Sequence, residues 1–311
     1  MRFGRDHGAD AAGGGWTAVV PAAGRIDIAH VSRSGDGPPR VLVWESFAAE
    51  AMDAAVVRRL RGRIRGRCTT LLGYGQYQML QTEAPSVPPE EMANALRWRV
   101  KDMVSFPVEQ AGIDFVPIPA EATPGRPPQV HVVVASHAVL TPLVRMFQAA
   151  GVRLDAIDIP ELAQRNLGVP FEAENRALAF LSFDEQGGRL TFNYAGEICV
   201  SRHIDVTSTA LARSSDDVGG LFERVLLDVQ RSLDNFDRNY SAVTLSRVLV
   251  APTPGAPGFT DYLKNNLYQK VEALDMSAGL DLGAVPALAE PAVQAQALLA
   301  IGAALREEVG T

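Results

Sequence analysis

The stretch QYQMLQTEAPSVPPEEMANALRWRVKDMVSFPVEQAGIDFVPIP, residues 76–119, carries most of the structural information in this chain. It opens with an alternating run, Gln76–Gln81, which is typical of a strand. A Pro-rich link ends at Pro89, which suits the first position of a helix because its φ is already helical and it has no N–H to leave unpaired. A second strand is predicted over Ile113–Val116. The order is therefore strand, link, helix, strand.

The helix of this stretch is predicted from apolar residues that recur at helical spacing: Met92, Leu96, Val100, Met103 and Val104. It should end near Ser105, because Pro107 follows. Trp98 lies off the apolar stripe. Shielding by a neighbouring loop is the favoured interpretation of Trp98, but exposed aromatics are enriched at interfaces, so a partner contact stays open.

Outward from this stretch, the chain shows the same plan twice. Each half begins with three short strands joined by turns and continues with alternating helices and strands, over residues 15–170 and 171–311. Residues 1–14 are rich in Gly and Ala and are predicted to be disordered. A helix is expected over Phe47–Arg63. A small subdomain is expected within the first half, over about residues 85–119.

Composition limits the classes of function. The chain has 311 residues, 47% hydrophobic and 21% charged, which are globular values, and a net charge of −7 argues against a nucleic-acid partner. No apolar run approaches the ~20 residues of a membrane helix, and the N-terminus lacks the apolar core of a secretory signal. Cys68 and Cys199 lie far apart in strand-like runs, consistent with buried thiols in a reducing compartment. A cytoplasmic location is expected.

Arginines concentrate in one segment, at Arg58, Arg59, Arg61, Arg63, Arg65 and Arg67. The favoured interpretation is a solvated helix end whose cations complement the helix dipole. The alternative is contact with anionic phospholipid, to which each basic residue could contribute about 1 kcal/mol.

Motifs for catalysis and cofactors are lacking in this sequence. No lysine stands in a phosphate-binding loop motif, and the five histidines show no metal-ligand spacing. No nucleophile elbow is present, and the paired acids lie at expected helix ends. Neither an enzyme, nor a metal, nor another cofactor is predicted.

Motifs along residues 16–307 resemble a known family. In the central stretch these are Gly75–Gln81, Val87–Met92, Trp98 with Lys101 and Asp102, and Phe106–Glu109. In the second half they are Ser201–Ile204, Asp228–Phe236 and Ala300–Arg306. The chain resembles the MshI-type proteins of MSHA pilus biogenesis, which belong to the PilM-like actin-fold family of type IV pilus assembly proteins.

The resemblance implies an α/β protein with the actin-like, ribonuclease H-like ATPase fold, in two related halves with an inserted subdomain. ATP-binding relatives hold phosphates with two hairpin turns. Here the first turn, Pro21–Gly24, lacks their pattern, and Leu181 and Phe183 stand where relatives have Asp and Gly. Pro252 and Pro254 replace glycines of the nucleoside turn and donate no N–H. A degenerate nucleotide site is expected, with Leu181 and Phe183 filling the phosphate position.

The function that the resemblance implies is a scaffold, peripheral to the cytoplasmic face of the inner membrane, that binds the cytoplasmic tail of a PilN- or MshJ-like membrane protein. The pilus assembly ATPase is a further partner that the resemblance allows. The expected walls of the tail site are Tyr77, Leu80, Leu96, Trp98 and Met103. Two alternatives stay open: an ATP-binding PilM-like switch, and the cytoplasmic scaffold of a type II secretion platform of the GspL kind.

Overall fold

The computed structural model describes residues 14–33, 37–213 and 218–307. It has eight α-helices and thirteen strands among these residues, with short 3-10 turns between them. The helices are α1 Ala54–Leu60, α2 Pro89–Arg99, α3 His137–Ala149, α4 Pro160–Gly168, α5 Ser208–Arg213, α6 Val218–Asn239, α7 Phe259–Asn266 and α8 Pro291–Ala304. The predicted disorder over residues 1–14 falls almost wholly outside the described residues.

The first five-stranded sheet has the order β3-β2-β1-β4-β8. Its strands are β1 Trp16–Ala22, β2 Arg25–Ser32, β3 Arg40–Ala48, β4 Arg67–Leu71 and β8 Ala156–Asp158. The first three form an antiparallel meander, and β4 and β8 run parallel to β1. β1 and β2 are buried over nearly their whole length, as strands covered on both faces should be.

The second sheet repeats this plan with the order β11-β10-β9-β12-β13. Its strands are β9 Ala177–Asp184, β10 Gly187–Tyr194, β11 Glu197–Ile204, β12 Leu245–Val250 and β13 Val271–Ala273. Again three antiparallel strands are followed by two parallel ones. The duplicated plan that the sequence predicts is therefore present at the level of strand order and direction.

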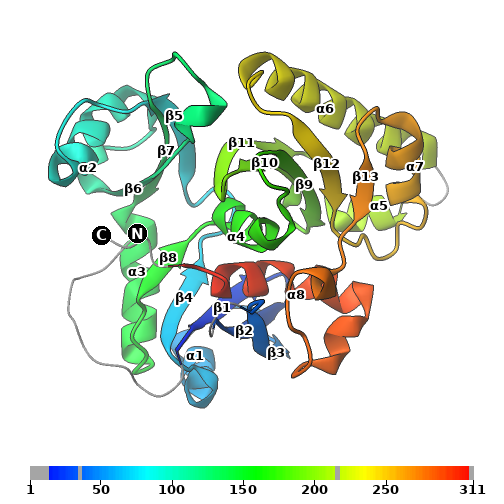
Figure 1. Cartoon of the computed structure of the whole chain (residues 1–311). Coiled ribbons are helices and arrows are strands. Elements are labelled where there is room, and N and C mark those ends of the chain that lie inside the picture. The colour runs from blue at the N-terminus through cyan, green and yellow to red at the C-terminus, as the bar shows by residue number, and fades with distance from the viewer. Residues whose placement is uncertain (1–13, 34–36, 214–217, 308–311) are drawn as a thin grey trace.

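A third, three-stranded sheet forms the inserted subdomain, at the upper left of Figure 1. Its order is β5-β7-β6, from β5 Gln78–Glu83, β7 Gln129–Ser136 and β6 Ala111–Pro117, and all pairs are antiparallel. α2 packs against this sheet over a core that includes Leu96, Val100 and Val132. The sheet needs β5 and β7, so the subdomain spans about residues 78–136 rather than the expected 85–119.

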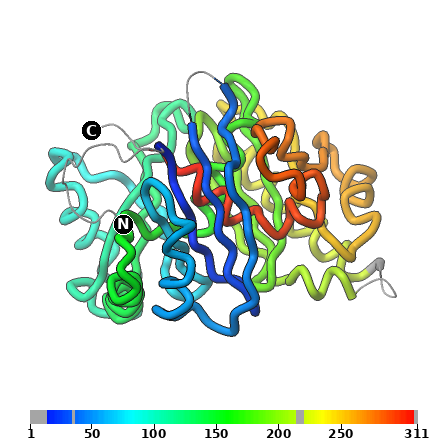
Figure 2. The backbone as a smooth tube through the Cα atoms, turned by 90° about the horizontal axis from the view of Figure 1, so that it is seen from below, coloured from blue at the N-terminus to red at the C-terminus, as the bar shows by residue number. Residues whose placement is uncertain are grey.

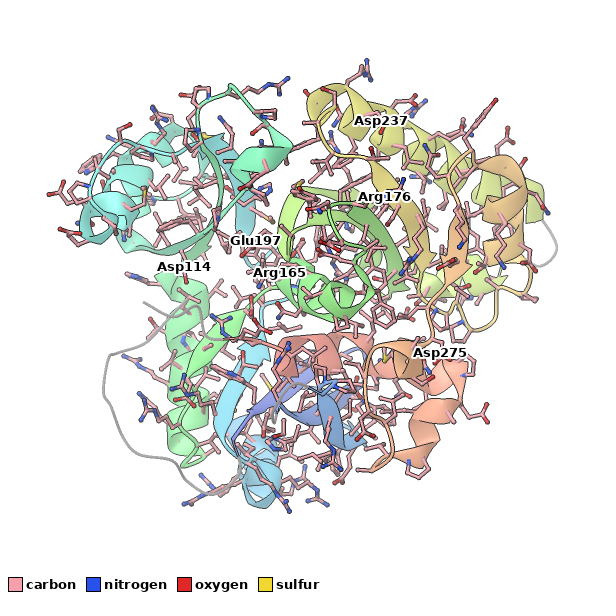
Figure 3. All side chains as sticks on the ribbon, viewed as in Figure 1. Asp114, Arg165, Arg176, Glu197, Asp237 and Asp275 are labelled. Atoms are coloured by element: carbon pink, nitrogen blue, oxygen red, sulfur yellow. The ribbon has the colours of Figure 1, made fainter. Side chains whose placement is uncertain are left out.

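Helices α4 and α8 lie between the two large sheets (Figure 1). α4 comes from the first half of the chain but packs on β9, β10 and β11, and Arg165 donates to Glu197 Oε2 at 2.5 Å (Figure 3). α8 ends the chain's second half but packs on β1, β2 and β4, and Figure 2 shows it crossing behind those strands. The two halves therefore exchange helices and share one apolar core.

Gly302 allows α4 and α8 to approach closely. A Cβ at this position would lie 2.2 Å from the carbonyl oxygen of Ala163. Asn166 Nδ2 also donates to the carbonyl of Gly302 at 3.1 Å. The backbones of the two exchanged helices therefore meet where no side chain fits.

Two expected helices are shorter than predicted. β3 continues through Phe47, which pairs with Ile26, and α1 begins only after Asp53, whose carboxylate accepts from the N–H of Val56 at 2.8 Å. The predicted helix over Phe47–Arg63 is therefore wrong in its first part. α2 ends at Arg99 instead of near Ser105, and a 3-10 turn over Lys101–Met103 follows.

Candidate functional site

The two hairpin turns that hold phosphates in actin-like ATPases face each other here. In the β9–β10 turn, Asp184 Oδ1 accepts from the N–H of Gln186 at 2.7 Å, so Asp184 caps the turn. Arg25, which follows the β1–β2 turn, is near enough to help lower the pKa of Glu185 in the opposite turn. The two hairpin turns therefore lie within electrostatic range of each other.

The β9–β10 turn carries a carboxylate that is bonded to α5. Glu185 accepts from the hydroxyls of Thr209 at 2.5 Å and Ser208 at 2.7 Å, and these hydrogen bonds, Thr209 first, hold the pKa of Glu185 below its usual range. Glu185 is therefore charged at neutral pH. A negative charge on the β9–β10 turn is unfavourable for a phosphate at that turn.

Leu181 and Phe183 do not lie where the sequence analysis expects them. Leu181 is fully buried in the core that α6 and α7 form on the second sheet. Phe183 packs against that core, with its ring edge-on to Phe259 at 5.6 Å. Side chains alternate across a strand, and these two point to the α6–α7 face. The expectation that they fill the phosphate position is wrong.

No group of three or more His, Cys, Asp or Glu side chains in the described ranges could hold a metal ion. Helix α7, after the expected nucleoside turn, begins at Phe259 behind Gly258, whose φ is +83° and which offers no capping side chain. No helix in the part of the chain that the structure describes is long and apolar enough to cross a membrane.

A groove with a volume of about 910 Å³ lies between β6 and α3. β6 is the last strand of its sheet and, among the described residues, pairs only with β7, so its outer edge has no strand partner there. Four consecutive residues, Ala111 to Asp114, line the groove. Side chains of both strand faces contribute, which is the pattern of a strand that presents its edge. Figure 3 labels Asp114 where the inserted subdomain meets α3.

The groove has an apolar floor and a charged rim. Ile113 on β6 and Leu140 and Val144 on α3 supply the floor. The rim carries both signs of charge, in Arg97, Glu109, Asp114 and Arg145. A segment with a few apolar anchors and polar flanks would match this lining.

Arg97 fixes the start of the exposed edge. Its Nη1 donates to the carbonyls of Val108 at 2.6 Å and Ala111 at 2.8 Å. These bonds tie α2 to the beginning of β6. The edge is therefore held in place without a neighbouring strand.

The five residues predicted as walls of a partner site do not line this groove. Leu96 is fully buried and Leu80 is partly buried, and both pack in the core of the inserted subdomain. Leu96 is thus a core residue and not a surface wall, which corrects the prediction for that position. Trp98 and Met103 are 62% and 48% exposed. Tyr77 packs on the opposite face of the sheet.

Two of these residues have defined neighbours. The Nζ of Lys101 lies 5.5 Å from the centre of the Trp98 ring, so the Trp98 side chain rests under a cation and not under a loop. The hydroxyl of Tyr77 donates to Glu161 Oε2 at 2.5 Å, and burial raises the pKa of Tyr77. The structure brings together only Leu80 and Leu96.

The groove residues were missed because the open edge depends on strand order. Alternation predicts a strand but not which strand will lie at the edge of a sheet. One signal was present in Gly112, since a glycine within a strand often marks close approach of another backbone.

The arginine segment is partly engaged within the chain. Arg58 Nη2 donates to the carbonyl of Ala149 at 2.8 Å, which caps the end of α3. Arg63 pairs with Glu45 at 3.0 Å and lies over the Phe47 ring. Arg67 lies beside the Trp16 ring. These contacts agree with the favoured structural role, and they leave the lipid hypothesis untested.

Comparison with known proteins gave matches to solved structures alone: no protein-family model and no curated protein matches the chain. A PilM–PilN type IV pilus biogenesis complex is similar over 95% of this chain and 99% of that chain, at 19% identity and a TM-score of 0.72. Weaker similarity links it to a Bacteroides thetaiotaomicron protein with an actin-like ATPase fold (9% identity, 89% and 96% covered, TM-score 0.49). The cytoplasmic domain of EpsL, of the Vibrio cholerae type II secretion system, is similar at 12% identity (90% and 95% covered, TM-score 0.48). The strand order of both sheets and the match to the PilM structure confirm the predicted fold: the chain is an α/β protein with the actin-like fold.

Proposed function

We propose that this chain is a non-enzymatic scaffold of the PilM-like family and that the β6–α3 groove holds the short cytoplasmic tail of a PilN-like membrane protein. The observation that carries the proposal is the unpartnered edge of β6, which faces α3 across a groove of about 910 Å³. A protein of the same fold, similar over 95% of this chain, was solved as a PilM–PilN complex, which supports a partner of this kind.

The groove suits an extended peptide. A strand added to a sheet edge gains main-chain hydrogen bonds, and pockets for alternate side chains supply specificity. Ile113, Leu140 and Val144 would receive the apolar side chains, and a few such anchors give most of the affinity of an interface. Arg145 would pair with acidic groups of the tail, and Glu109 with basic ones.

The proposal also predicts where in the cell the protein lies and which pilus system it serves. A scaffold that holds a membrane-protein tail would lie at the cytoplasmic face of the inner membrane. Among pilus systems, the MSHA type is favoured by the motifs Gly75–Gln81 and Phe106–Glu109. The partner would then be MshJ-like.

Thr141→Arg tests the groove. Thr141 is exposed on α3 and lines the groove, so a long charged side chain there should block a bound strand without disturbing the core. Affinity for a labelled synthetic peptide of the PilN-like tail, measured by fluorescence polarisation, should fall by at least about tenfold, as for loss of a central interface contact. Ala138→Arg is the matched control, because Ala138 is exposed on the same helix outside the groove lining.

The outcome distinguishes binding of the tail in the β6–α3 groove from binding at the surface predicted from the sequence. Equal affinity of wild type and Thr141→Arg would reject the groove. A loss of affinity in Trp98→Ala together with Leu80→Ala would place the tail on the α2 side instead.

The ATP-binding switch is the competing proposal. Glu185 on the β9–β10 turn argues against it, because its negative charge would oppose a triphosphate held at that turn. Isothermal titration with Mg·ATP decides between them, and micromolar binding would overturn the scaffold proposal. Recovery of pilus or of secretion components from inner membranes would decide which platform is served.

A further inference from the structure

A second cavity, of about 590 Å³, lies between the inserted subdomain and the second half. Its walls are one face of the β5–β7 sheet, the edge strand β11 and the C-terminal end of α6. This volume is in the range of small-molecule sites, which occur preferentially where two parts of a protein meet. No residue of the hairpin turns 22–25 and 184–187 lines it, although Tyr74 in its lining donates to Gln186 of the second turn at 2.7 Å, so the cavity adjoins that turn without including it.

The lining is cationic although the chain is acidic. Arg126, from the β6–β7 connection, and Arg202, on β11, line the cavity, against one carboxylate, Glu161. Arg126 Nη1 donates to the carbonyl of Asn239 at 3.2 Å, and among the described residues neither guanidinium has a carboxylate partner. Glu161 already accepts the hydroxyl of Tyr77. Two arginines without counter-charges thus converge on one cavity in a chain of net charge −7.

Neutral hydrogen-bonding groups come from both sides. The sheet supplies Gln81 and Gln129, and the second half supplies Ser201 and Asn235. Sites of this type place a few polar groups around a ligand to fix its orientation. A ligand here would touch the inserted subdomain and the second half together.

We propose that this cavity binds a small soluble anion that carries phosphate groups, held by Arg126 and Arg202. The guanidinium group presents a planar fork of donors that matches phosphate oxygens two at a time. The two guanidinium groups, neither of which pairs with a carboxylate among the described residues, provide donors from two walls of the cavity. Because the ligand bridges two parts of the chain and binds only the folded state, it should also raise the melting temperature. This site is independent of the tail groove, and either can exist without the other.

Inorganic pyrophosphate is the probe, in calorimetric titrations of the full chain. Arg202→Gln and Arg126→Gln should each weaken binding by at least about tenfold, the usual effect of losing a charged hydrogen-bond partner. Arg202 is exposed and makes no ion pair among the described residues, so its variant should fold normally. Glu161→Gln should tighten binding, because it removes the one carboxylate of the lining. Arg59→Gln, an exposed arginine elsewhere, is the control for net charge.

Four results would overturn the proposal. The first is that pyrophosphate gives neither a heat of binding nor a rise in the melting temperature of the protein. Arg59→Gln could lose as much affinity as Arg202→Gln, which would mean unspecific attraction. Arg25→Gln alone could abolish binding, which would place the anion at the hairpin turns. Vesicles that contain phosphatidylglycerol could bind through Arg202 while pyrophosphate does not, which would assign the arginines to a lipid headgroup.

Discussion

His131 is the single residue whose chemistry most clearly couples the inserted subdomain to the second half. It is 5% exposed, and its Nε2 lies 3.2 Å from the carbonyl oxygen of Cys199 on β11. Burial lowers the pKa of His131 to about 4, against the smaller opposing effect of this hydrogen bond. The neutral imidazole therefore donates Nε2–H to the carbonyl at neutral pH.

This coupling predicts an acid-sensitive contribution to stability. The unfolded chain titrates His131 near 6.5 and the folded chain near 4, so the unfolded state binds more protons between these values. As pH falls from 7 to 4, the free energy of unfolding of the wild type should fall by about 3 kcal/mol relative to that of His131→Gln. Glutamine keeps a donor for the Cys199 carbonyl but does not titrate.

Urea unfolding at a series of pH values measures this difference. Other groups with shifted pKa values, such as Asp27, whose pKa is raised by burial, occur in both proteins and cancel in the comparison. Parallel pH profiles for the two proteins would contradict the prediction.

At the scale of elements, the α4–α8 contact can be tested with Gly302→Ala. Helix propensity and the close contact between the two helices predict opposite changes in stability for this substitution. Gly302 lies in α8, where helix propensity alone predicts that alanine stabilises the protein by about 1 kcal/mol. The clash with the Ala163 carbonyl, at 2.2 Å from the added Cβ, predicts instead a loss of about 2–3 kcal/mol. We expect the loss, measured from denaturant midpoints.

Gly62→Ala is the matched control for that substitution. An added methyl at Gly62 meets no atom within 4 Å, so stability should change by less than about 0.5 kcal/mol. Stabilisation of the protein by Gly302→Ala would show that the two helices can move apart at little cost.

Sequence patterns predicted the elements of the fold better than their contacts. The succession of strands along the chain and its duplicated plan follow from local alternation and turn residues, which report the backbone directly. Met103 was placed on the buried stripe of α2 because helical spacing continues to it, but the helix ends at Arg99 and a 3-10 turn changes the phase. Its side chain is consequently exposed.

The candidate site was harder to predict because it depends on contacts between distant parts of the chain. The groove exists because β6 is an edge strand and α3 follows β7 directly, and both facts depend on pairing between distant segments. Leu181 and Phe183 were aligned by sequence to a phosphate site, yet their direction is set by which face of β9 meets α6 and α7. Periodicity predicts that side chains alternate between the two faces of a strand, but not which element packs against each face.

At the scale of the whole molecule, the exchange of α4 and α8 means that one apolar core is built from both halves. The inserted subdomain adds to this coupling, because Ile118 and Ala122 belong to the core of the second half. The N–H of Tyr74 also donates to Gln186 Oε1 at 2.7 Å, across the hairpin region. The halves should therefore unfold together.

The tryptophans allow a direct test of that cooperativity. All three, Trp16, Trp44 and Trp98, lie in the first half, so fluorescence reports on that half while far-ultraviolet circular dichroism reports on both. In Trp98→Phe, which removes the exposed ring, the fluorescence and dichroism transitions in urea should coincide, as in two-state unfolding. If the fluorescence transition were separated from the dichroism transition, the halves would be independent units. Hinge motion between them would then be available, and the rigid scaffold would lose its physical basis.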